Sequence, residues 1–435
     1  MSIRLSAIES KIFDYLLDVN NEFNLDITFR VAGGWVRDKI LGKESDDIDI
    51  ALDNMTGKQF CKHLQKKKES INIHIIQQNH EQCKHLEVAS VTIHGIVIDL
   101  VNLRSETYET SRIPITEVGT PKQDALRRDL TINSMFYNIN NGKIEDHTGL
   151  GMSDIADKVI RTPLDPYKTF VDDPLRILRA IRFSVRLGFT LEKTIIETIK
   201  TNKDIRNMLM DKVTPERRLA ELRKMMKHNA FHAIQLLHDI DIFECIFDTI
   251  YKIYINSDSL IHVNSLLIYL TIIYYGINNS EKQTKNDYTV GKQQKKKGYT
   301  VIEQKLNNLK VTNQEKRKIM SMETFCNNVI NISTKDELSI AKHIYILGDK
   351  DLLNDSVTII KTVVNDETQC DLIVDIVKKF SWCVGLECLL NGHEIMKYFN
   401  AKGKEISEFK DRIIDLQIAN KDCNKDFILD SLSLN

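Results

Sequence analysis

Proline and glycine are scarce in this chain of 435 residues, which contains 6 prolines and 17 glycines. All six prolines lie between positions 114 and 215, so residues 216–435 carry none. Because a proline inside a helix costs about 3 kcal/mol, a tract without proline allows long helices. The composition excludes collagen-like and proline-rich chains and a turn-dense β protein, and it favours helices after position 216.

Neither sign of charge dominates the sequence. Lys and Arg number 60 and Asp and Glu number 61, which gives a formal net charge of −1. No global positive field attracts nucleic acid, so any contact with RNA has to come from a local patch. Residues 176–228 form such a patch, with 14 basic residues against 6 acidic ones.

Long hydrophobic runs and cysteine clusters are also missing. The most apolar stretch, residues 260–275, contains His262, Asn264 and Ser265 and is shorter than the roughly 20 apolar residues of a membrane span. We expect a buried helix there and no membrane partner. The 8 cysteines lack metal-ligand spacing, and the N-terminus has no apolar secretory core. We therefore expect a cytoplasmic protein with reduced thiols, with nuclear and mitochondrial pools as open alternatives.

The hydrophobic patterns predict an α+β fold, with an N-terminal mixed β-sheet followed by helices. A helical repeat covers residues 8–19, and strand patterns occur at 29–32, 48–50, 71–76, 87–93 and 96–101. A loop rich in Ser, Thr and Glu is expected from about 104 to 124, and mainly helices after 125. The polar, lysine-rich residues 278–297 predict a disordered insertion, either a solvated loop or a contact for RNA phosphates.

A glycine turn after the first predicted strand suits phosphate binding. Gly33 and Gly34 allow backbone N–H groups to approach a phosphate closely. A helix starting at Trp35 would add the positive end of its dipole. Arg37, in the first turn of that helix, can bind phosphate oxygens through two guanidinium nitrogens. A Gly-Gly pair alone is usually a plain turn, so the pattern gains meaning only from its neighbours.

Three acids follow at positions that suit a metal ion. Asp47 and Asp49 lie two residues apart on a predicted strand, so both carboxylates leave the same face. Two oxygen ligands on one face suit Mg²⁺, which takes water and phosphate oxygens as further ligands. Asp99 lies in an apolar strand, where an unpaired acid is costly, so it either joins the metal site or pairs with a base. The set fits metal-assisted nucleotidyl transfer, whereas each acid alone also fits a solvated surface.

In this order and spacing, the motifs resemble the class II tRNA nucleotidyltransferases, the CCA-adding enzymes of the polymerase-beta-like nucleotidyltransferase superfamily. The segment from Arg127 to Asn133 is similar to the second motif of that family. The resemblance implies that Arg128 contacts the triphosphate or ribose and that Asp129 orders this arginine or the loop. A helix-capping cluster is the alternative for this segment. Residues 102–114 look like the version carried by eukaryotic members.

The segment from Asp172 to Arg182 resembles the part of these enzymes that recognises the incoming base. Asp173 and Arg176, expected three residues apart on a helix, place an acceptor beside a donor, which complements the pairing edges of both cytosine and adenine. Uracil and guanine present the reverse pattern. Arg179 and Arg182 would continue towards the phosphates. A helix with a solvated basic face is the alternative for this segment taken alone.

The resemblance implies four domains and a reaction. The domains are a catalytic head over 1–140, a helical neck over 141–215, a helical body over 216–330 and a tRNA-binding tail over 331–435. The implied reaction is template-independent addition of C, C and A to the 3′ end of tRNA from CTP and ATP, with Mg²⁺ as cofactor and pyrophosphate as leaving group. Two alternatives share these motifs: a poly(A) polymerase or split CC- or A-adding enzyme, and a catalytically silent RNA-binding protein.

Overall fold

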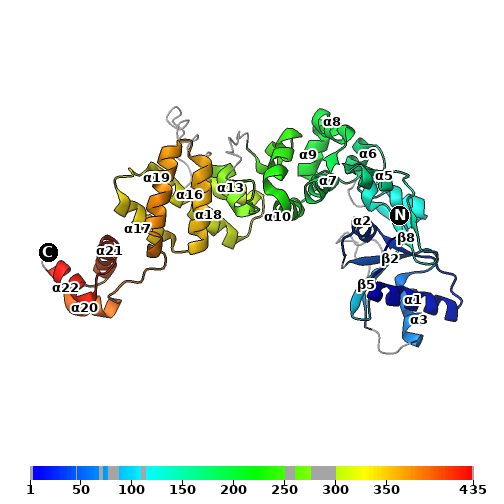
Figure 1. Cartoon of the computed structure of the whole chain (residues 1–435), viewed down its shortest axis with the longest axis horizontal. Coiled ribbons are helices and arrows are strands. Elements are labelled where there is room, and N and C mark those ends of the chain that lie inside the picture. Colours follow the sequence, from blue (N-terminus) through cyan, green and yellow to red (C-terminus); the bar gives the residue numbers. More distant parts are fainter. Residues whose placement is uncertain are drawn as a thin grey trace, which may run out of the picture. The chain divides into compact units, whose positions relative to one another are not determined.

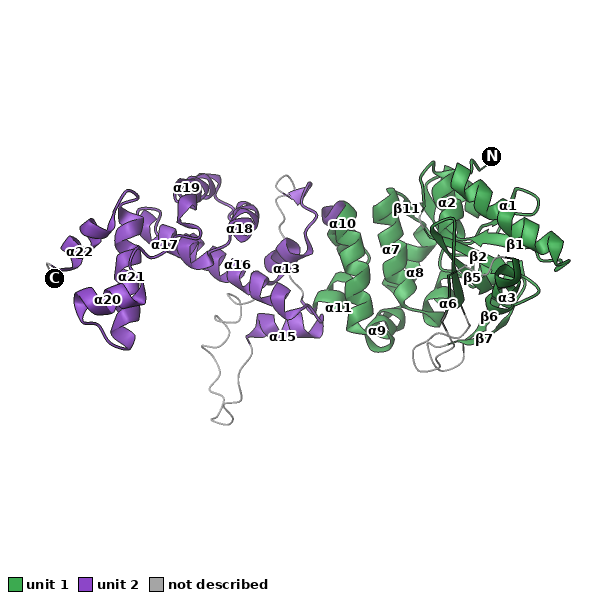
Figure 2. Cartoon of the chain, turned by 90° about the horizontal axis from the view of Figure 1, so that it is seen from below, with its two compact units in different colours: residues 1–228, 232–247 green, residues 229–231, 248–435 purple. Residues whose placement is uncertain are grey.

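The chain folds into two compact units (Figure 2). A computed structural model describes residues 3–45, 47–67, 72–76, 88–108, 114–249, 260–275 and 300–433. The first unit comprises residues 1–228 and 232–247, and the second comprises 229–231 and 248–435. The expected insertion at 278–297 lies outside the described residues. Within the described residues, no helix has both the length and the apolar character that a membrane crossing requires.

The first unit contains a seven-stranded mixed sheet in the order β3-β4-β5-β2-β1-β8-β9, and Figure 1 labels β2, β5 and β8. β2 and β5 run parallel, and the other neighbouring strands are antiparallel. The strands are β1 (Phe29–Ala32), β2 (Ile48–Leu52), β3 (Ile73–Ile76), β4 (Val88–Ile93), β5 (Ile96–Asn102), β8 (Phe136–Asn138) and β9 (Lys143–Glu145). The predicted α+β class with an N-terminal mixed sheet is confirmed.

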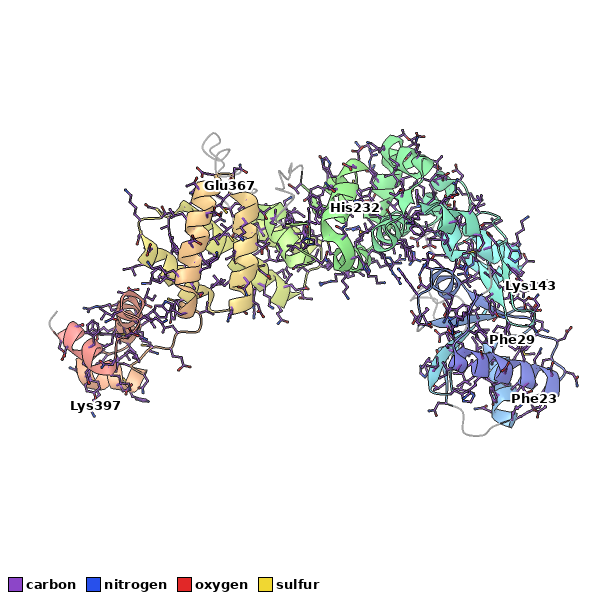
Figure 3. The ribbon with its side chains drawn as sticks, viewed as in Figure 1. Phe23, Phe29, Lys143, His232, Glu367 and Lys397 are labelled. Carbon is purple, nitrogen blue, oxygen red and sulfur yellow. The ribbon has the colours of Figure 1, made fainter. Side chains whose placement is uncertain are left out.

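One face of the central strands is apolar and the other carries acids. Ile50 on β2 and Leu100 on β5 are completely buried, and α3 (Gly57–Lys67) covers that face. A side chain at Gly57 would come within 2.7 Å of the Leu100 carbonyl oxygen, so the glycine allows α3 to approach β5 closely. Phe29 on β1, which is labelled in Figure 3, packs edge-on against Phe60 of α3, with ring centroids 5.2 Å apart. Each such buried side chain contributes about 1.5–3 kcal/mol to folding.

Two expectations about residues 104–145 were wrong. The segment predicted as a loop forms a hairpin of β6 (Arg104–Thr107) and β7 (Ile115–Val118), followed by α4 (Pro121–Leu126). After 125 the chain does not become mainly helical at once, because β8 and β9 complete the sheet beside β1. These strands have only three or four residues, so an alternation of apolar and polar residues cannot be recognised in their sequence. Pairing with neighbouring strands decides their structure.

Helices dominate the rest of the first unit, which also contains a short parallel pair, β10 (Val159–Ile160) and β11 (Thr190–Leu191). α1 (Ala7–Glu22) precedes the sheet and α2 (Gly34–Ile40) follows β1. The later helices are α5 (Gly151–Ala156), α6 (Pro166–Asp172), α7 (Leu175–Leu187), α8 (Lys193–Thr201), α9 (Lys203–Lys212), α10 (Pro215–Asp239) and α11 (Phe243–Phe247). Prolines open α4, α6 and α10, where a missing N–H costs nothing.

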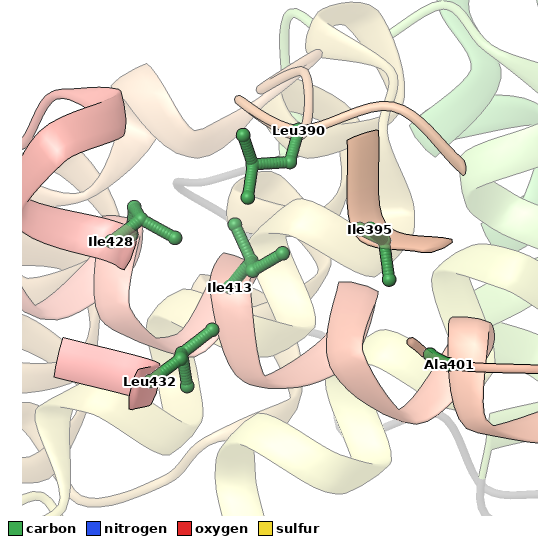
Figure 4. Packing of buried hydrophobic residues seen from close by; sticks show 6 residues of the cluster. All are labelled: Leu390, Ile395, Ala401, Ile413, Ile428 and Leu432. Carbon is green, nitrogen blue, oxygen red and sulfur yellow. The ribbon is translucent and has the colours of Figure 1, made fainter. Parts of the chain in front are cut away.

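In the described residues of the second unit, the secondary structure is helical. Its helices are α13 (Leu266–Tyr275), α15 (Val301–Asn308), α16 (Asn313–Asn331), α17 (Glu337–Leu347), α18 (Lys350–Val363), α19 (Glu367–Lys379), α20 (Gly392–Phe399), α21 (Lys404–Ala419) and α22 (Lys425–Ser433). α13 is buried against α16 and α18, which confirms the expected buried helix. The last three helices share a cluster around Ile395, Ile413 and Ile428 (Figure 4). The predicted division into four domains stays a prediction.

Candidate active site

Two of the three predicted acids meet on neighbouring strands. Asp49 on β2 and Asp99 on β5 are direct partners in the parallel register, where strands lie about 4.8 Å apart. Both point away from the face that packs on α3, because their neighbours along each strand are buried. Asp47 lies exposed just before β2. Neither Asp49 nor Asp99 forms an ion pair with any described residue, although the Ser90 hydroxyl donates a hydrogen bond to Asp99.

The electrostatics of Asp49 fit a cation. Its pKa is raised, first by desolvation and then by the Asp99 carboxylate and by Asp47, while Arg128 and Arg104 act in the opposite direction. A cation bound between these carboxylates would relieve the repulsion that raises the pKa. No group of three or more Asp, Glu, His or Cys side chains within the described residues forms a ready-made metal cage. The residues therefore fit a metal that takes further ligands from water or substrate.

The glycine turn is shaped by Arg128. Gly33 has φ +71°, and a Cβ at this position would lie 2.6 Å from Arg128 Nη1 and 3.3 Å from the Asn133 carbonyl oxygen. Only glycine both adopts this positive φ readily and leaves room for Arg128 and the Asn133 carbonyl. The Gly33 N–H donates to the Met135 carbonyl at 3.0 Å, so it is already used within the protein. α2 begins at Gly34, one residue before the predicted start.

Arg37 is buried and fully engaged by protein groups. Its Nε and Nη2 donate to the two carboxylate oxygens of Asp38 at 2.8 and 2.9 Å, and Nη1 donates to Asn133 Oδ1. The guanidinium also lies over the Phe183 ring, 4.8 Å from its centroid. Burial lowers the pKa of Arg37, with Asp38 acting against that shift. Arg37 would have to exchange a partner before it could bind a phosphate.

Arg128 is held by an acid that the sequence reasoning missed. Asp124 is buried and accepts from Arg128 Nε and Nη2 at 3.0 and 2.8 Å, and it also binds Arg127. Burial raises the pKa of Asp124, but the two arginines outweigh it and the net shift is downwards. The signal was in the sequence, because an acid three and four residues before two arginines on a helix faces both of them.

The expected side-by-side placement of Asp173 and Arg176 on one helix was wrong. α7 begins at Leu175 with Pro174 as its N-cap, and Asp173 is extended with φ −142° and ψ 101°. Arg176 Nη2 donates to the Arg127 carbonyl at 2.7 Å, while the Asp173 carboxylate accepts from the Leu175 N–H. Among the ion pairs of the described residues, none joins Asp173 to Arg176.

The remaining arginines of α7 are anchored by acids. Arg179 donates to Asp129 through Nε at 2.7 Å, and its Nη2 lies 2.6 Å from the same carboxylate oxygen. Asp129 therefore orders Arg179 and not Arg128, which Asp124 holds. Arg182 Nε lies 3.1 Å from Glu221 Oε2 in an ion pair that lacks hydrogen-bond geometry. Each of the predicted arginines already has a protein partner.

Comparisons with known proteins agree with this arrangement. Residues 29–161 match the family model of the poly A polymerase head domain, and residues 188–252 match that of a probable RNA and SrmB-binding site of polymerase A. The chain is 42% identical over 241 residues to the mitochondrial CCA tRNA nucleotidyltransferase of Saccharomyces cerevisiae. That match covers 52% of this chain and 44% of the relative, so the chain spans about half the length of the curated relatives it matches.

Solved structures share the fold over the whole chain. A CCA-adding enzyme in its apo form II has a TM-score of 0.71 and 22% identity, with 99% of this chain and 96% of that chain covered. The CCA-adding enzyme of Thermotoga maritima complexed with tRNA has a TM-score of 0.65 and 20% identity, covering 99% of this chain and 97% of that one. At such identities the likeness shows the fold alone.

The mixed sheet and the paired acids lie in the part of the chain, residues 29–161, that matches the family model of the poly A polymerase head domain. Such a fold implies the use of a divalent metal ion. Over about half of its length the chain is similar to eukaryotic CCA tRNA nucleotidyltransferases, and over its whole length it shares the fold of CCA-adding enzymes.

Proposed function

We propose that this protein adds C, C and A to the 3′ end of tRNA from CTP and ATP without a nucleic-acid template and releases pyrophosphate. The observation that carries the proposal is the register of Asp49 and Asp99 on the open face of the sheet. Arg128 is near enough to influence Asp49 electrostatically. The name and the identity of the yeast relative support the same reaction.

In this proposal Asp47 and Asp49 hold Mg²⁺, and Asp99, oriented by Ser90, completes the carboxylate set. A bound Mg²⁺ would lower the pKa of the attacking 3′ hydroxyl and offset charge on the leaving side. Arg128 lies against Gly33 and supplies a positive charge for the triphosphate, with Gly34 at the same turn. Because Asp124 fixes Arg128, its guanidinium needs little reorganisation when the substrate binds.

The other candidates for the triphosphate are Arg37, Arg179 and Arg182. Each is bound to a carboxylate, namely Asp38, Asp129 or Glu221. A triphosphate carries more negative charge than one carboxylate and can attract such an arginine away from its acid or share it. We propose that Asp173 and Arg176 select the base once a nucleotide lies between them. One carboxylate oxygen of Asp173 accepts from the Leu175 N–H and the other pairs with Arg217 at 3.6 Å, a distance too long for a hydrogen bond, so a base could replace Arg217 there.

A direct assay tests the proposed reaction. Purified protein is incubated with tRNA that lacks its terminal triplet, with CTP and ATP, and the products are sequenced. We expect addition to stop after C, C and A, and to require a divalent cation. Unlimited addition of A, arrest after two C, or addition of A alone to a CC end would each overturn full CCA addition.

A poly(A) polymerase is the second candidate, since the matching head domain carries that name. It predicts long A tails on any RNA with a free 3′ end, and the same sequencing assay separates the two activities. A catalytically silent RNA-binding protein predicts no extension by either nucleotide. We also propose a mitochondrial pool beside a cytoplasmic one, in line with the name of the yeast relative.

A further inference from the structure

Asn133 is a buried residue that contacts several charged groups around the candidate site. It ends η2 (Thr131–Asn133), a short 3-10 helix, and is 6% exposed. Its side-chain Oδ1 accepts from Arg37 Nη1, and its Nδ2 donates to Asp129 Oδ1 at 3.1 Å. Its backbone carbonyl accepts from Arg128 Nη1 at 3.3 Å. One neutral residue therefore connects two arginines and an acid that come from different parts of the chain.

The two arginines that contact Asn133 directly, Arg37 and Arg128, are held in the same pattern. In each of them, Nε and Nη2 donate to one acid, Asp38 or Asp124 respectively. In each of them, Nη1 donates to an oxygen of Asn133. The acid fixes two nitrogens of the planar guanidinium and Asn133 fixes the third, so acid and amide together decide where each guanidinium points.

Asn133 also acts on a third arginine through Asp129. Asp129 Oδ1 accepts from Asn133 and from the Leu130 N–H, the latter at 2.9 Å. The other oxygen, Oδ2, accepts from Arg179 Nε at 2.7 Å. Because Oδ1 is held by two donors, the carboxylate stays turned with Oδ2 towards Arg179.

An amide suits the place between Arg37 and Asp129. The cation needs an acceptor and the anion needs a donor, and an asparagine presents one of each without carrying a charge. A carboxylate at position 133 would repel Asp129. An apolar side chain would leave two buried charged groups without this partner, which costs more than the hydrogen bonds themselves contribute.

We propose that Asn133 is a positioning residue for the arginines that bind the triphosphate of the incoming nucleotide. The side chains of Arg128 and Arg179 are 21% and 34% exposed, so a substrate can reach them. The side chain of Arg37 is 3% exposed and holds Asn133 from the interior. Guanidinium groups whose directions are fixed before binding stabilise phosphate charge without reorganising. This inference rests on the proposed function and adds the residue that sets these directions.

The test replaces Asn133 by an acid of the same shape. Asn133→Asp places a carboxylate beside that of Asp129. The matched control is Asn138→Asp, because Asn138 is 5% exposed and its Nδ2 donates to the Glu145 carboxylate at 2.7 Å. The Oδ1 of Asn138 accepts from backbone N–H groups. The control therefore creates the same repulsion between two carboxylates in the same unit, at partners other than the arginines of the site.

Binding of CTP and of inorganic tripolyphosphate is measured by titration calorimetry with Mg²⁺ and without tRNA. In Asn133→Asp both Kd values should rise about tenfold, because both probes carry the triphosphate that the arginines bind. In the control both should change by less than about twofold. In extension assays the KM for CTP and ATP should rise, whereas the KM for tRNA and the preference for C and A over U and G should not change.

Asn133→Ser is the second variant, and it decides the question if Asn133→Asp does not fold. The shorter side chain withdraws the amide from both of its partners without adding a charge. We expect both Kd values to rise about threefold, less than with the acid, because no carboxylate repels Asp129.

Three outcomes would overturn the inference. The first is unchanged Kd values in a folded Asn133 variant, and the second is an equal rise in Asn138→Asp. The third is a rise for CTP without one for tripolyphosphate, which would mean that Asn133 acts on the base or the ribose. Because no tRNA is present, a protein that binds CTP without extending tRNA would contradict the proposed function and not this inference.

Discussion

At the scale of single residues, the arginines near the candidate site are held by buried acids. Asp38, Asp124 and Asp129 are all less than a tenth exposed and bind Arg37, Arg128 and Arg179 respectively. A guanidinium fixed in this way keeps its direction and loses less freedom when it binds an anion. The acids therefore position the arginines, and they also set how strongly a phosphate has to compete for them.

Gly33→Ala tests the close approach between the glycine turn and Arg128. Both this variant and Gly42→Ala place alanine at a positive φ, +71° and +70°, so each should lose about 1 kcal/mol of stability. Only Gly33 has Arg128 in the way, since nothing lies within 4 Å of a Cβ at Gly42. We expect the KM for CTP and ATP to rise about tenfold in Gly33→Ala alone. Equal KM values in the two variants would contradict a role for Arg128 at the triphosphate.

Arg176→Ala tests base selection. The variant loses the guanidinium that would pair with the incoming base, as well as its bond to the Arg127 carbonyl. A site that cannot satisfy the polar edge of a base loses discrimination of about 1–3 kcal/mol. We expect the preference for C and A over U and G to fall about tenfold or more in competition assays, while the Kd for tRNA changes little. An unchanged preference would remove Arg176 from base selection.

At the scale of elements, α7 is the connection between the sheet and the helices that follow it. Arg176 binds the carbonyl of Arg127, Arg179 binds Asp129 and Arg186 contacts Asp38, so three arginines of α7 attach to the part of the unit that carries the sheet. These arginines make α7 the basic helix that the sequence shows. They stabilise the first unit in addition to any role in binding a substrate.

Asp129→Asn should loosen that connection. Burial raises the pKa of Asp129, but Arg179 and Asn133 outweigh it and the net shift is downwards. A carboxylate with a lowered pKa adds stability above its unfolded pKa of about 3.9, and this is lost as pH falls through the folded pKa. We expect the free energy of unfolding, measured with urea at pH 7, to fall by an amount on the order of 2 kcal/mol in the variant. When the pH is lowered below about 4, the variant should lose less further stability than wild type does.

The exposed Asp157→Asn is the control for this measurement, and it should match wild type at both pH values. If Asp129→Asn is as stable as wild type at pH 7, the contact between the Asp129 carboxylate and Arg179 does not stabilise the fold, which would contradict this prediction.

At the scale of the whole molecule, the candidate site belongs to the first unit alone. Asp49, Asp99, Arg128 and Arg176 all lie within it, and the described residues of the second unit form helices without strands. Binding of a metal ion at this site can be measured through the stability of the whole protein, because a ligand that binds only the folded state raises the melting temperature.

Mg²⁺ should stabilise the wild-type protein and not Asp49→Asn. At ten times its Kd, Mg²⁺ adds about 1.4 kcal/mol to wild type. Without metal, Asp49→Asn should have the higher melting temperature of the two proteins at a pH above the pKa of Asp49. The raised pKa of Asp49 means that its charged form is disfavoured in the folded state, and the amide removes that charge. Calorimetry with and without Mg²⁺ measures both effects. An equal Mg²⁺ shift in the two proteins would contradict Asp49 as a ligand.

Much of the candidate site could be predicted from local patterns. The period-two alternation around Asp49 and Asp99 gave both strands and both outward-facing acids, and Gly33 marked a turn that only glycine can form. The partners of the arginines could not be predicted in the same way. Asp129 and Arg179 are 50 residues apart, and no periodicity connects them. The placement of Asp173 also failed, because the break between α6 and α7 depends on one extended residue.

The sequence by itself determined the mixed sheet with its acids and the helical second half, because these depend on local periodicity, on proline placement and on motif spacing. Only the tertiary structure decided that β8 and β9 complete the sheet and that β2 lies beside β5 in the register that aligns Asp49 with Asp99. It also decided which acid holds each arginine. Such contacts join residues far apart in the chain, and only packing of the folded chain brings them together.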